Sequence, residues 1–186
     1  YGCAQPTEDL AKAYDDAGDK VRKNATLLSN AEAVEIEKAA KGDKIAPITS
    51  DRTGFYNRKL YLKPGEREED YGNNQPLNHK LIRLGEVYLN YAEACAKTND
   101  EGEARIYLKK IRERAGLPEI TSTGEQLFED IINERRLELG LEGFRFFDIV
   151  RVGWASKTFK NFKPGAELLP IPQTEVDISK GEITNK

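Results

Sequence analysis

Apolar residues recur at steps of three and four along residues 81–115, the spacing that lines one face of a helix. In the first half of this stretch the apolar positions are Leu81, Leu84, Tyr88, Tyr91 and Cys95. After a polar break at 98–99, the second half repeats the spacing with Ala104, Leu108, Ile111 and Ala115. Because the connection is short, the pattern predicts two antiparallel helices, at 81–97 and 101–115, with their apolar faces together.

The second helix carries start and stop signals. Asp100, with Glu103 three residues later, fits a helix start, because a side-chain acceptor meets unpaired N–H groups and acids complement the positive dipole end. Gly116 tolerates the left-handed cap conformation, and Pro118 cannot continue a helix. We therefore expect this helix to end at about residue 115.

The predicted hairpin also matches one unit of a tetratricopeptide repeat. Leu84-Gly85 followed by Tyr88 has the small-residue notch and aromatic of a first repeat helix. A single repeat unit cannot bury both of its faces. Neighbouring helices are therefore expected, either elsewhere in this chain or in sequence beyond it.

Further helices are predicted on both sides of the hairpin. Thr7 is expected to cap a helix that Gly18 ends, residues 19–29 are expected to be extended or irregular, and residues 31–40 form an Ala- and Glu-rich helix. Thr123 and Gln126 have the spacing of a capping box. The apolar stripe that follows this box comprises Leu127, Phe128, Ile131, Ile132 and Leu139.

Residues 45–78 and 153–186 read as loop-rich, because Pro and Gly interrupt any long element. Short strand-like runs occur at 55–56 and 60–62. Tyr56, Tyr61 and Tyr71 fall in the first of these regions. Such rings can be platforms for the apolar faces of sugars, but anchoring the loop is the simpler role, since an ordered loop must bury something.

Composition narrows the class of protein. With 33% charged residues and a mean hydropathy of -0.68, the sequence contains no apolar run long enough to span a membrane. The net charge is -3 and the basic residues are dispersed among acids, which gives no footprint for nucleic acid. The sequence has no Met, so Tyr1 is not a translation start, and we expect the chain to be a segment of a longer gene product.

Few residues are available for catalysis or for binding a metal. The chain has one His and two Cys, which argues against zinc of the usual ligation and leaves His79 as the lone candidate for nucleophilic catalysis. Cys95 is expected to be a small buried hydrophobe, and no apolar run precedes Cys3 to make it a lipoprotein cysteine. No phosphate-binding glycine motif occurs, and no signature singles out a pair of glycosidase carboxylates. The residues therefore predict a helical binding or scaffold domain, not an enzyme, with no cofactor and no metal.

The densest charged stretch is expected to be structural. Its residues alternate in sign at steps of three or four, so they can satisfy one another across the break at Gly143. We interpret this alternating series as a charge network that holds two helices together, in preference to an active site. Its members are Arg135, Glu138, Glu142, Arg145, Asp148 and Arg151.

Several motifs, in order along nearly the whole chain, resemble those of the SusD/RagB family. Residues 83–94 resemble its "RLAEVYLNYAEA", and residues 111–117 its "IRxRAGL". Residues 134–151 resemble its "ERRxEL…EGxRxxDLxRW", and residues 169–175 its "LxPIPxxE". Two weaker matches lie at 5–10, for "PTQ(D/E)L", and at 54–59, for "TGYxxRK".

The resemblance implies a cell-surface lipoprotein of Bacteroidota that docks on a SusC-like TonB-dependent barrel in the outer membrane. Such proteins capture oligosaccharides, or peptides in the RagB branch, for import. Their fold is mainly α, with tetratricopeptide-like helical hairpins as a scaffold and long irregular loops that carry the ligand. Membrane attachment would be only through an N-terminal lipid that this chain does not include.

The match is to part of a family member. Residues 1–186 are expected to be the C-terminal part, with the helical scaffold mainly at 79–152. The family's "RWG" appears here with the Trp displaced to Trp154, so no role is carried over to it. Tyr1 resembles the position where relatives place a ring near the glycan, and Tyr56 and Tyr71 are the next candidates for ligand contact.

Glycan capture at the outer membrane is therefore the leading hypothesis. A peptide-binding RagB-like uptake subunit is the first alternative, and a tetratricopeptide scaffold that binds a protein tail is the second. A glycoside hydrolase is the enzymatic alternative, for which we expect no product release.

Overall fold

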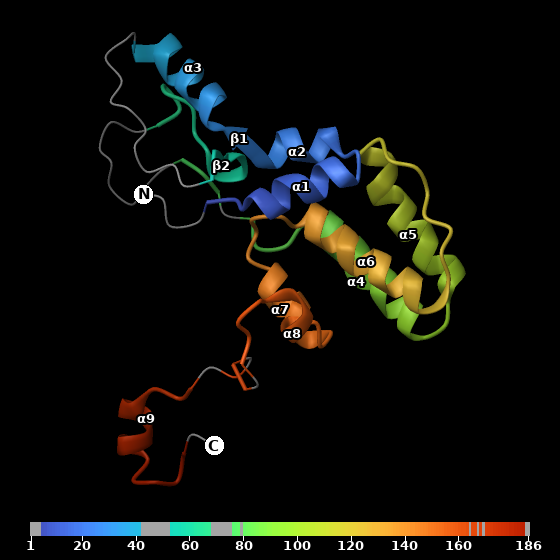
Figure 1. Ribbon diagram of the computed structural model, residues 1–186, viewed down its shortest axis with the longest axis vertical. Helices are drawn as coiled ribbons and strands as arrows, with labels where there is room; N and C mark the ends of the chain where they lie inside the picture. Colours follow the sequence, from blue (N-terminus) through green and yellow to red (C-terminus); the bar gives the residue numbers. More distant parts are fainter. Residues whose placement is uncertain are drawn as a thin grey trace. The chain divides into compact units, whose positions relative to one another are not determined.

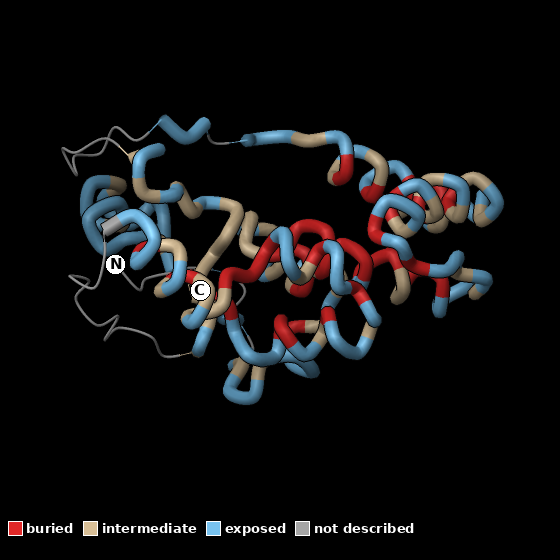
Figure 2. The backbone as a smooth tube through the Cα atoms, turned by 90° about the horizontal axis from the view of Figure 1, so that it is seen from above, coloured by how far each residue is buried: buried red, intermediate tan, exposed pale blue. Residues whose placement is uncertain are grey.

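The computed structural model describes residues 5–41, 53–67, 76–78, 80–163, 165–166, 168 and 170–184. The chain divides into two compact units, Tyr1–Arg145 and Phe146–Lys186. The first unit is built mainly of helices, and buried and exposed residues alternate along them (Figure 2). The mainly α fold predicted from the sequence is confirmed.

The predicted hairpin is present in the first unit as α4 (Leu84–Lys97) and α5 (Glu101–Arg114). A third helix, α6 (Gly124–Glu138), packs against both (Figure 1). The hairpin is confirmed, and its apolar interior continues into α6. The shared core consists of Leu89, Ala92, Cys95, Ala104, Leu108, Ile111, Leu127 and Ile131.

The ends of α5 form as the sequence predicted. The Asp100 side chain accepts a hydrogen bond from the Glu103 N–H at 3.3 Å. Gly116 has φ +70, and the Leu117 N–H donates to the Arg112 carbonyl at 2.9 Å. This last bond satisfies a carbonyl that the helix itself leaves without a partner, so the left-handed residue closes the helix.

The buried face of α4 differs from the predicted one. Leu89 and Ala92 are fully buried, whereas Leu84 is 61% exposed and Tyr91 is 45% exposed. Leu81 lies before the helix begins and is 78% exposed. The helix carries apolar residues on two faces, and the face with the smaller side chains allows α5 and α6 to approach more closely.

The first helix, α1 (Glu8–Asp16), begins as predicted, with the Thr7 hydroxyl accepting from the Leu10 N–H at 3.2 Å. Residues 19–29 were predicted to be extended or irregular; this was wrong for α2 (Lys20–Thr26), whereas β1 (Leu27–Ser29) is extended. Asp19 caps α2 by accepting from the Arg22 N–H at 2.9 Å. Asp19 and Arg22 are buried in an ion pair, which a hydropathy pattern cannot distinguish from an exposed polar loop. The second apolar cluster joins Leu10, Ala11, Tyr14, Leu27 and Leu137.

A small antiparallel sheet follows, in which β1 pairs with β2 (Phe55–Asn57) and Leu28 lies opposite Tyr56. The predicted helix at 31–40 is α3 (Asn30–Lys41). The run at 60–62 is not a strand, because η1 (Arg58–Leu60), a 3₁₀ turn, follows β2 directly. The Asn57 side chain starts this turn by accepting from the Lys59 N–H at 3.1 Å.

The capping box predicted for α6 does not form. Thr123 occupies the cap position, but its side chain makes no capping hydrogen bond. The Gly124 N–H instead donates to the Glu101 carboxylate at 2.7 Å. A carboxylate from α5 thus accepts the hydrogen bond of a backbone N–H that has no partner within α6. The apolar stripe after it is buried as predicted, at Leu127, Phe128, Ile131, Ile132 and Leu139.

The second unit contains short helices. Arg145, the last residue of the first unit, begins α7 (Arg145–Arg151), which α8 (Ala155–Thr158) and α9 (Gln173–Ile178) follow. The Lys157 ammonium lies 4.0 Å from the Trp154 ring centroid, a cation–π contact. In the described part of the whole chain, no helix combines the length and apolar character that crossing a bilayer requires.

Candidate functional site

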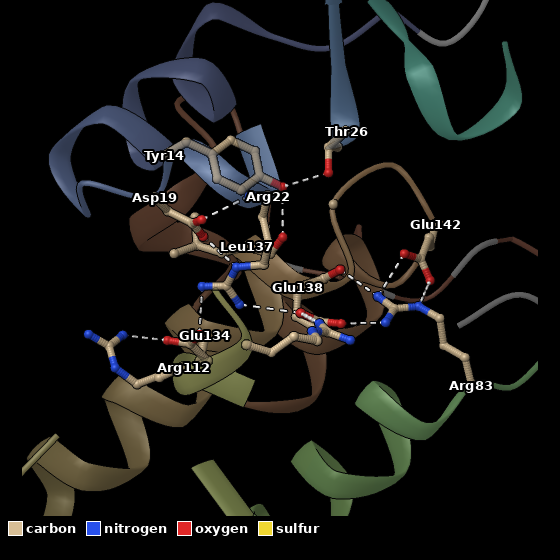
Figure 3. Close-up of polar contacts among 12 residues, drawn as sticks. Tyr14, Asp19, Arg22, Thr26, Arg83, Arg112, Glu134, Leu137, Glu138 and Glu142 are labelled. Carbon is tan, nitrogen blue, oxygen red and sulfur yellow. Dashed lines mark hydrogen bonds and ion pairs between the residues drawn. The ribbon is translucent and has the colours of Figure 1, made fainter. Parts of the chain in front are cut away.

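Buried charges gather at the C-terminal end of α6. Glu134 and Glu138 are 2% and 3% exposed, and basic side chains from α2, η1, α5 and the residue before α4 surround them (Figure 3). A buried charge is costly unless it is paired and hydrogen-bonded, so the pairing decides whether this group is stable. We define the charge cluster as Asp19, Arg22, Lys59, Arg83, Arg112, Arg114, Glu134, Glu138 and Glu142.

Glu138 is the centre of the charge cluster. One of its carboxylate oxygens accepts from the Arg83 guanidinium. The other accepts from Arg114 and, at 3.3 Å, from Arg22. Three arginines from separate segments therefore share one carboxylate, which fixes those segments relative to α6.

Arg22 links this centre to α2. It is 6% exposed, donates through Nε to Asp19, and places Nη2 2.7 Å from a Glu134 oxygen. The other Glu134 oxygen accepts from Arg112 Nη1 at 2.7 Å. Every charge in this group has an opposite partner within the cluster, as a buried ionic network requires.

Lys59 and Arg83 close the cluster at the end of α6. The Lys59 ammonium donates to the Glu138 carbonyl at 3.2 Å and to the Gly140 carbonyl at 2.9 Å. Lys59 and Arg83 both pair with Glu142, and the bond from Arg83 Nε is 2.6 Å long. The carbonyls that a helix C-terminus leaves unpaired are thus satisfied by a cation, which also suits the negative dipole end.

Hydrogen bonds from the surrounding cations set the protonation states of Glu138 and Glu142. Burial alone would raise the pKa of Glu138, but bonds from Arg114 and Arg83 outweigh it and lower this pKa to about 2. Burial likewise opposes ionisation of Glu142, yet bonds from Arg83 and Lys59 lower its pKa. A general acid in glycoside hydrolysis needs a raised pKa and a free proton. Both carboxylates have a lowered pKa and already accept bonds from cations, so they are unsuited to that role.

A pocket of about 630 Å³ lies beside the charge cluster. Its charged lining includes Lys59 and Arg83, which both donate to the Glu142 carboxylate. Among the described residues that line it, the apolar ones are aliphatic and none carries an aromatic ring. Its aliphatic residues are Val21, Ala25, Leu60, Leu77 and Leu141.

Three of the six residues of the predicted alternating series, Arg135, Glu138 and Glu142, are bonded to other elements. Glu138 and Glu142 belong to the charge cluster, whereas Arg135 is 4% exposed and donates to the Asn90 side chain at 2.5 Å. Asp148 and Arg151 pair with each other at 2.7 Å within α7. Arg145 begins that helix. The spacing located the charges but not their partners.

The predicted ligand-contacting tyrosines are only partly placed. Tyr1 and Tyr71 lie outside the described residues, as do Cys3 and His79. Tyr56 lies on β2 and is half-buried. Because two of the three predicted rings lie outside the described residues, the ligand role of the three tyrosines stays a prediction.

Sequence reasoning missed the cations that complete the charge cluster. Arg22, Lys59 and Arg83 lie 50 or more residues from Glu138 and Glu142, which they bind, so helical spacing could not pair them. Arg83 and Arg114 both fall within the motifs that resemble the family, which was the one available signal. In the described residues, no group of three or more His, Cys, Asp or Glu side chains is arranged to hold a metal ion. Cys95 is a buried free thiol in the helical core.

Comparison with known proteins agrees with these features. A sequence model described as the SusD family matches residues 20–167. A SusD-like protein from Bacteroides ovatus is 40% identical over 156 residues, which are 76% of this chain and 26% of that protein.

Solved structures show the same likeness. Surface glycan-binding protein A from Bacteroides thetaiotaomicron, solved with laminarihexaose, superposes with a TM-score of 0.77 at 28% identity, over 95% of this chain and 40% of that one. A laminarin-binding SusD-like protein superposes with a TM-score of 0.70 at 32% identity, over 91% and 35% of the two chains. The chain thus spans less than half the length of these relatives. Sequence and structure agree that this chain belongs to the SusD family.

Proposed function

We propose that the protein binds oligosaccharides at the bacterial cell surface without cleaving them and delivers them to a SusC-like TonB-dependent transporter. One observation carries this proposal: a relative solved with laminarihexaose matches 95% of the chain, with a TM-score of 0.77. At 28% identity the likeness extends beyond the fold to the sequence. The ligand class named for that relative is the best guide to the class that this protein takes.

The chemistry of the described residues supports a non-catalytic role. The buried carboxylates Glu134 and Glu138 and the partly buried Glu142 all pair with cations, and Glu138 has a pKa of about 2. The charge cluster serves instead as a rigid connection between helices. A rigid helical frame suits a protein that presents loops to a ligand, because binding-competent loops then require little reorganisation.

We further propose the family's placement for the whole protein. Residues 1–186 form the C-terminal part of a SusD/RagB-like domain, with the helical scaffold mainly at 79–152 and loops at 45–78 and 153–186. The complete polypeptide is lipid-anchored at its N-terminus in the outer membrane and faces outward. This placement rests on family membership and on the 40% of the solved relative that the chain spans.

A glycan array run beside a peptide panel tests the ligand class. We expect binding to one class of oligosaccharide, laminarin-type β-glucans being the first to examine, and no binding to the peptides. Selective binding of peptides would replace this proposal with the RagB-like alternative. Binding to neither, together with capture of a defined protein tail, would favour the tetratricopeptide scaffold.

Tyr1, Tyr56 and Tyr71 are the proposed ring contacts. Substituting any one of them by Ala removes a stacking surface, and we expect a loss of affinity of about fivefold to tenfold for the oligosaccharide that the array selects. Isothermal titration calorimetry measures this directly. Tyr61→Ala is the matched control, because the Tyr61 ring lies near Tyr56 in sequence but bonds internally to Glu37 at 2.9 Å. Equal losses in the control and in the three variants would remove these residues from the site.

A further inference from the structure

The pocket of about 630 Å³ beside the charge cluster is formed wholly by residues of the first unit. Its walls come from α2, from η1, from residues 77–83 and from the C-terminal ends of α5 and α6. Concave sites of this size, lined by apolar side chains with a few convergent polar groups, are typical of small-molecule binding. The size and lining of the pocket therefore indicate a site for a small molecule.

Aliphatic side chains of the lining are open to solvent. Val21 is 55% exposed and Leu60 is 53% exposed, although both line a pocket. Leu77, which is 38% exposed, adds a third such side chain from the residues before α4. Removing this apolar surface from water stabilises a bound molecule that has an aliphatic body.

The two carboxylates of the lining are already paired with cations. Glu138 accepts hydrogen bonds from three arginines, and Glu142 accepts them from Lys59 and Arg83. The charge cluster as a whole contains five basic side chains and four carboxylates, so its net charge is positive. The pocket therefore attracts an anion in spite of the carboxylates in its wall.

Two basic side chains of the lining have hydrogen-bond donors left for a ligand. Lys80 is exposed, and its ammonium makes no ion pair or hydrogen bond with the residues that the structure describes. Arg114 donates through Nη2 to Glu138, and its side chain is 56% exposed. A guanidinium carries five N–H donors, and the others of Arg114 meet no acceptor among the described residues. Lys80 and Arg114 thus bring positive charge and unused donors to the pocket.

We propose that the pocket binds a small organic anion, whose carboxylate is held by Lys80 and Arg114 and whose aliphatic body lies against Val21 and Leu60. Arginine suits this role because its planar N–H groups match the two oxygens of a carboxylate. A neutral sugar leaves the charges of Lys80 and Arg114 uncompensated, and an inorganic anion leaves the aliphatic side chains in water. The inference rests on the lining of this pocket and is independent of the oligosaccharide binding proposed above.

Isothermal titration calorimetry with octanoate tests the proposal in the complete polypeptide that carries residues 1–186. Octanoate combines a carboxylate with an aliphatic body, and octanamide is its neutral analogue of nearly the same shape. We expect octanoate to bind with a stoichiometry of one and about tenfold more tightly than octanamide, because octanamide lacks the negative charge. Equal affinities for the two compounds, or no binding of octanoate, would overturn the proposal.

Lys80→Gln tests the charged side of the pocket without disturbing the charge cluster, to which Lys80 does not belong. It should weaken octanoate binding about threefold to fivefold and leave octanamide binding unchanged. Lys63→Gln is the matched control, because Lys63 is also exposed and does not line the pocket. The control should change the octanoate affinity by less than about 1.5-fold. Equal losses in the two variants would place octanoate elsewhere and overturn the proposal.

Leu60→Ser tests the aliphatic side of the pocket. It should weaken the binding of octanoate and octanamide alike, by about fivefold, because both lose an apolar contact. Ile106→Ser is the matched control, since Ile106 is 49% exposed on α5 and does not line the pocket, and it should leave both affinities unchanged. An unchanged affinity in Leu60→Ser, or an equal loss in Ile106→Ser, would contradict the proposed placement of the aliphatic body.

Discussion

At the scale of single residues, Glu138 is the residue on which the charge cluster depends most. Arg22, Arg83 and Arg114 converge on its carboxylate, and each comes from a different segment of the first unit. Arginines brought together in a protein interior repel one another. The Glu138 carboxylate between them offsets that repulsion, because it attracts each of them. The stability of this region is therefore tied to one ionised side chain.

Glu138→Gln should reveal this dependence. The substitution preserves shape but leaves three arginines without their shared charge, so we expect a loss of about 3 kcal/mol in the free energy of unfolding. Urea denaturation at pH 7 measures it. The matched control, Glu125→Gln on the exposed face of the same helix, should change stability by less than about 0.5 kcal/mol. A loss in Glu138→Gln no larger than in the control would mean that the cluster contributes little.

The same residue predicts how stability depends on pH. Its pKa falls from 4.5 to about 2 on folding, so below the unfolded value the unfolded chain binds a proton that the folded chain does not. The stabilisation, about 3 kcal/mol, is complete above pH 4.5 and is lost as the pH falls toward 2. Glu142 acts in the same direction, since its pKa is also lowered.

Unfolding titrations at pH 7 and pH 3 check this prediction. The natural protein should lose stability between the two, and Glu138→Gln should lose about 2 kcal/mol less, because Gln does not titrate. An identical pH dependence in both proteins would assign acid sensitivity to other carboxylates.

At the scale of elements, a glycine sets how closely α4 approaches the end of α6. A Cβ added at Gly85 would lie 2.5 Å from a Glu138 oxygen and 2.6 Å from an Arg83 nitrogen. Both atoms belong to the charge cluster, so neither side chain can move without breaking an ion pair. The small residue that the sequence showed in this helix thus makes room for the cluster.

Gly85→Ala should therefore destabilise the protein by about 1 to 3 kcal/mol, despite the higher helix propensity of Ala. Thermal and urea unfolding measure the change. Gly102→Ala on α5 is the matched control, because its added Cβ meets nothing closer than 4.0 Å, and it should be neutral or stabilising by up to about 1 kcal/mol. Stabilisation by both substitutions would show that the cluster relaxes freely around a methyl group.

Local sequence signals located helices more reliably than they identified which side of a helix is buried. The α5 helix was located from Asp100 and Gly116, because caps act over three or four residues. The buried side of α4 was misassigned because apolar residues lie on two sides, and only tertiary packing chooses between them. The α2 helix was missed because its charges are buried by partners such as Glu134, which lies far away in sequence.

At the scale of the whole molecule, the motifs predicted the family, and the comparisons confirmed it. The candidate site was less predictable. Carboxylates at 138 and 142 were identified from spacing, but the cations that fix their protonation come from α2, η1, α5 and the start of α4. No local pattern encodes such pairings. Of the tyrosines proposed to contact ligand, Tyr56 alone lies in the described part of the chain, so their role stays a prediction.

The central claim is that this protein binds a glycan and leaves it intact. The most direct test incubates the protein with the oligosaccharide that the array selects, measures binding by calorimetry, and then weighs the recovered sugar by mass spectrometry. The account predicts saturable binding and an unchanged oligosaccharide mass. Shorter products released by the protein, or no binding to any oligosaccharide on the array, would contradict it.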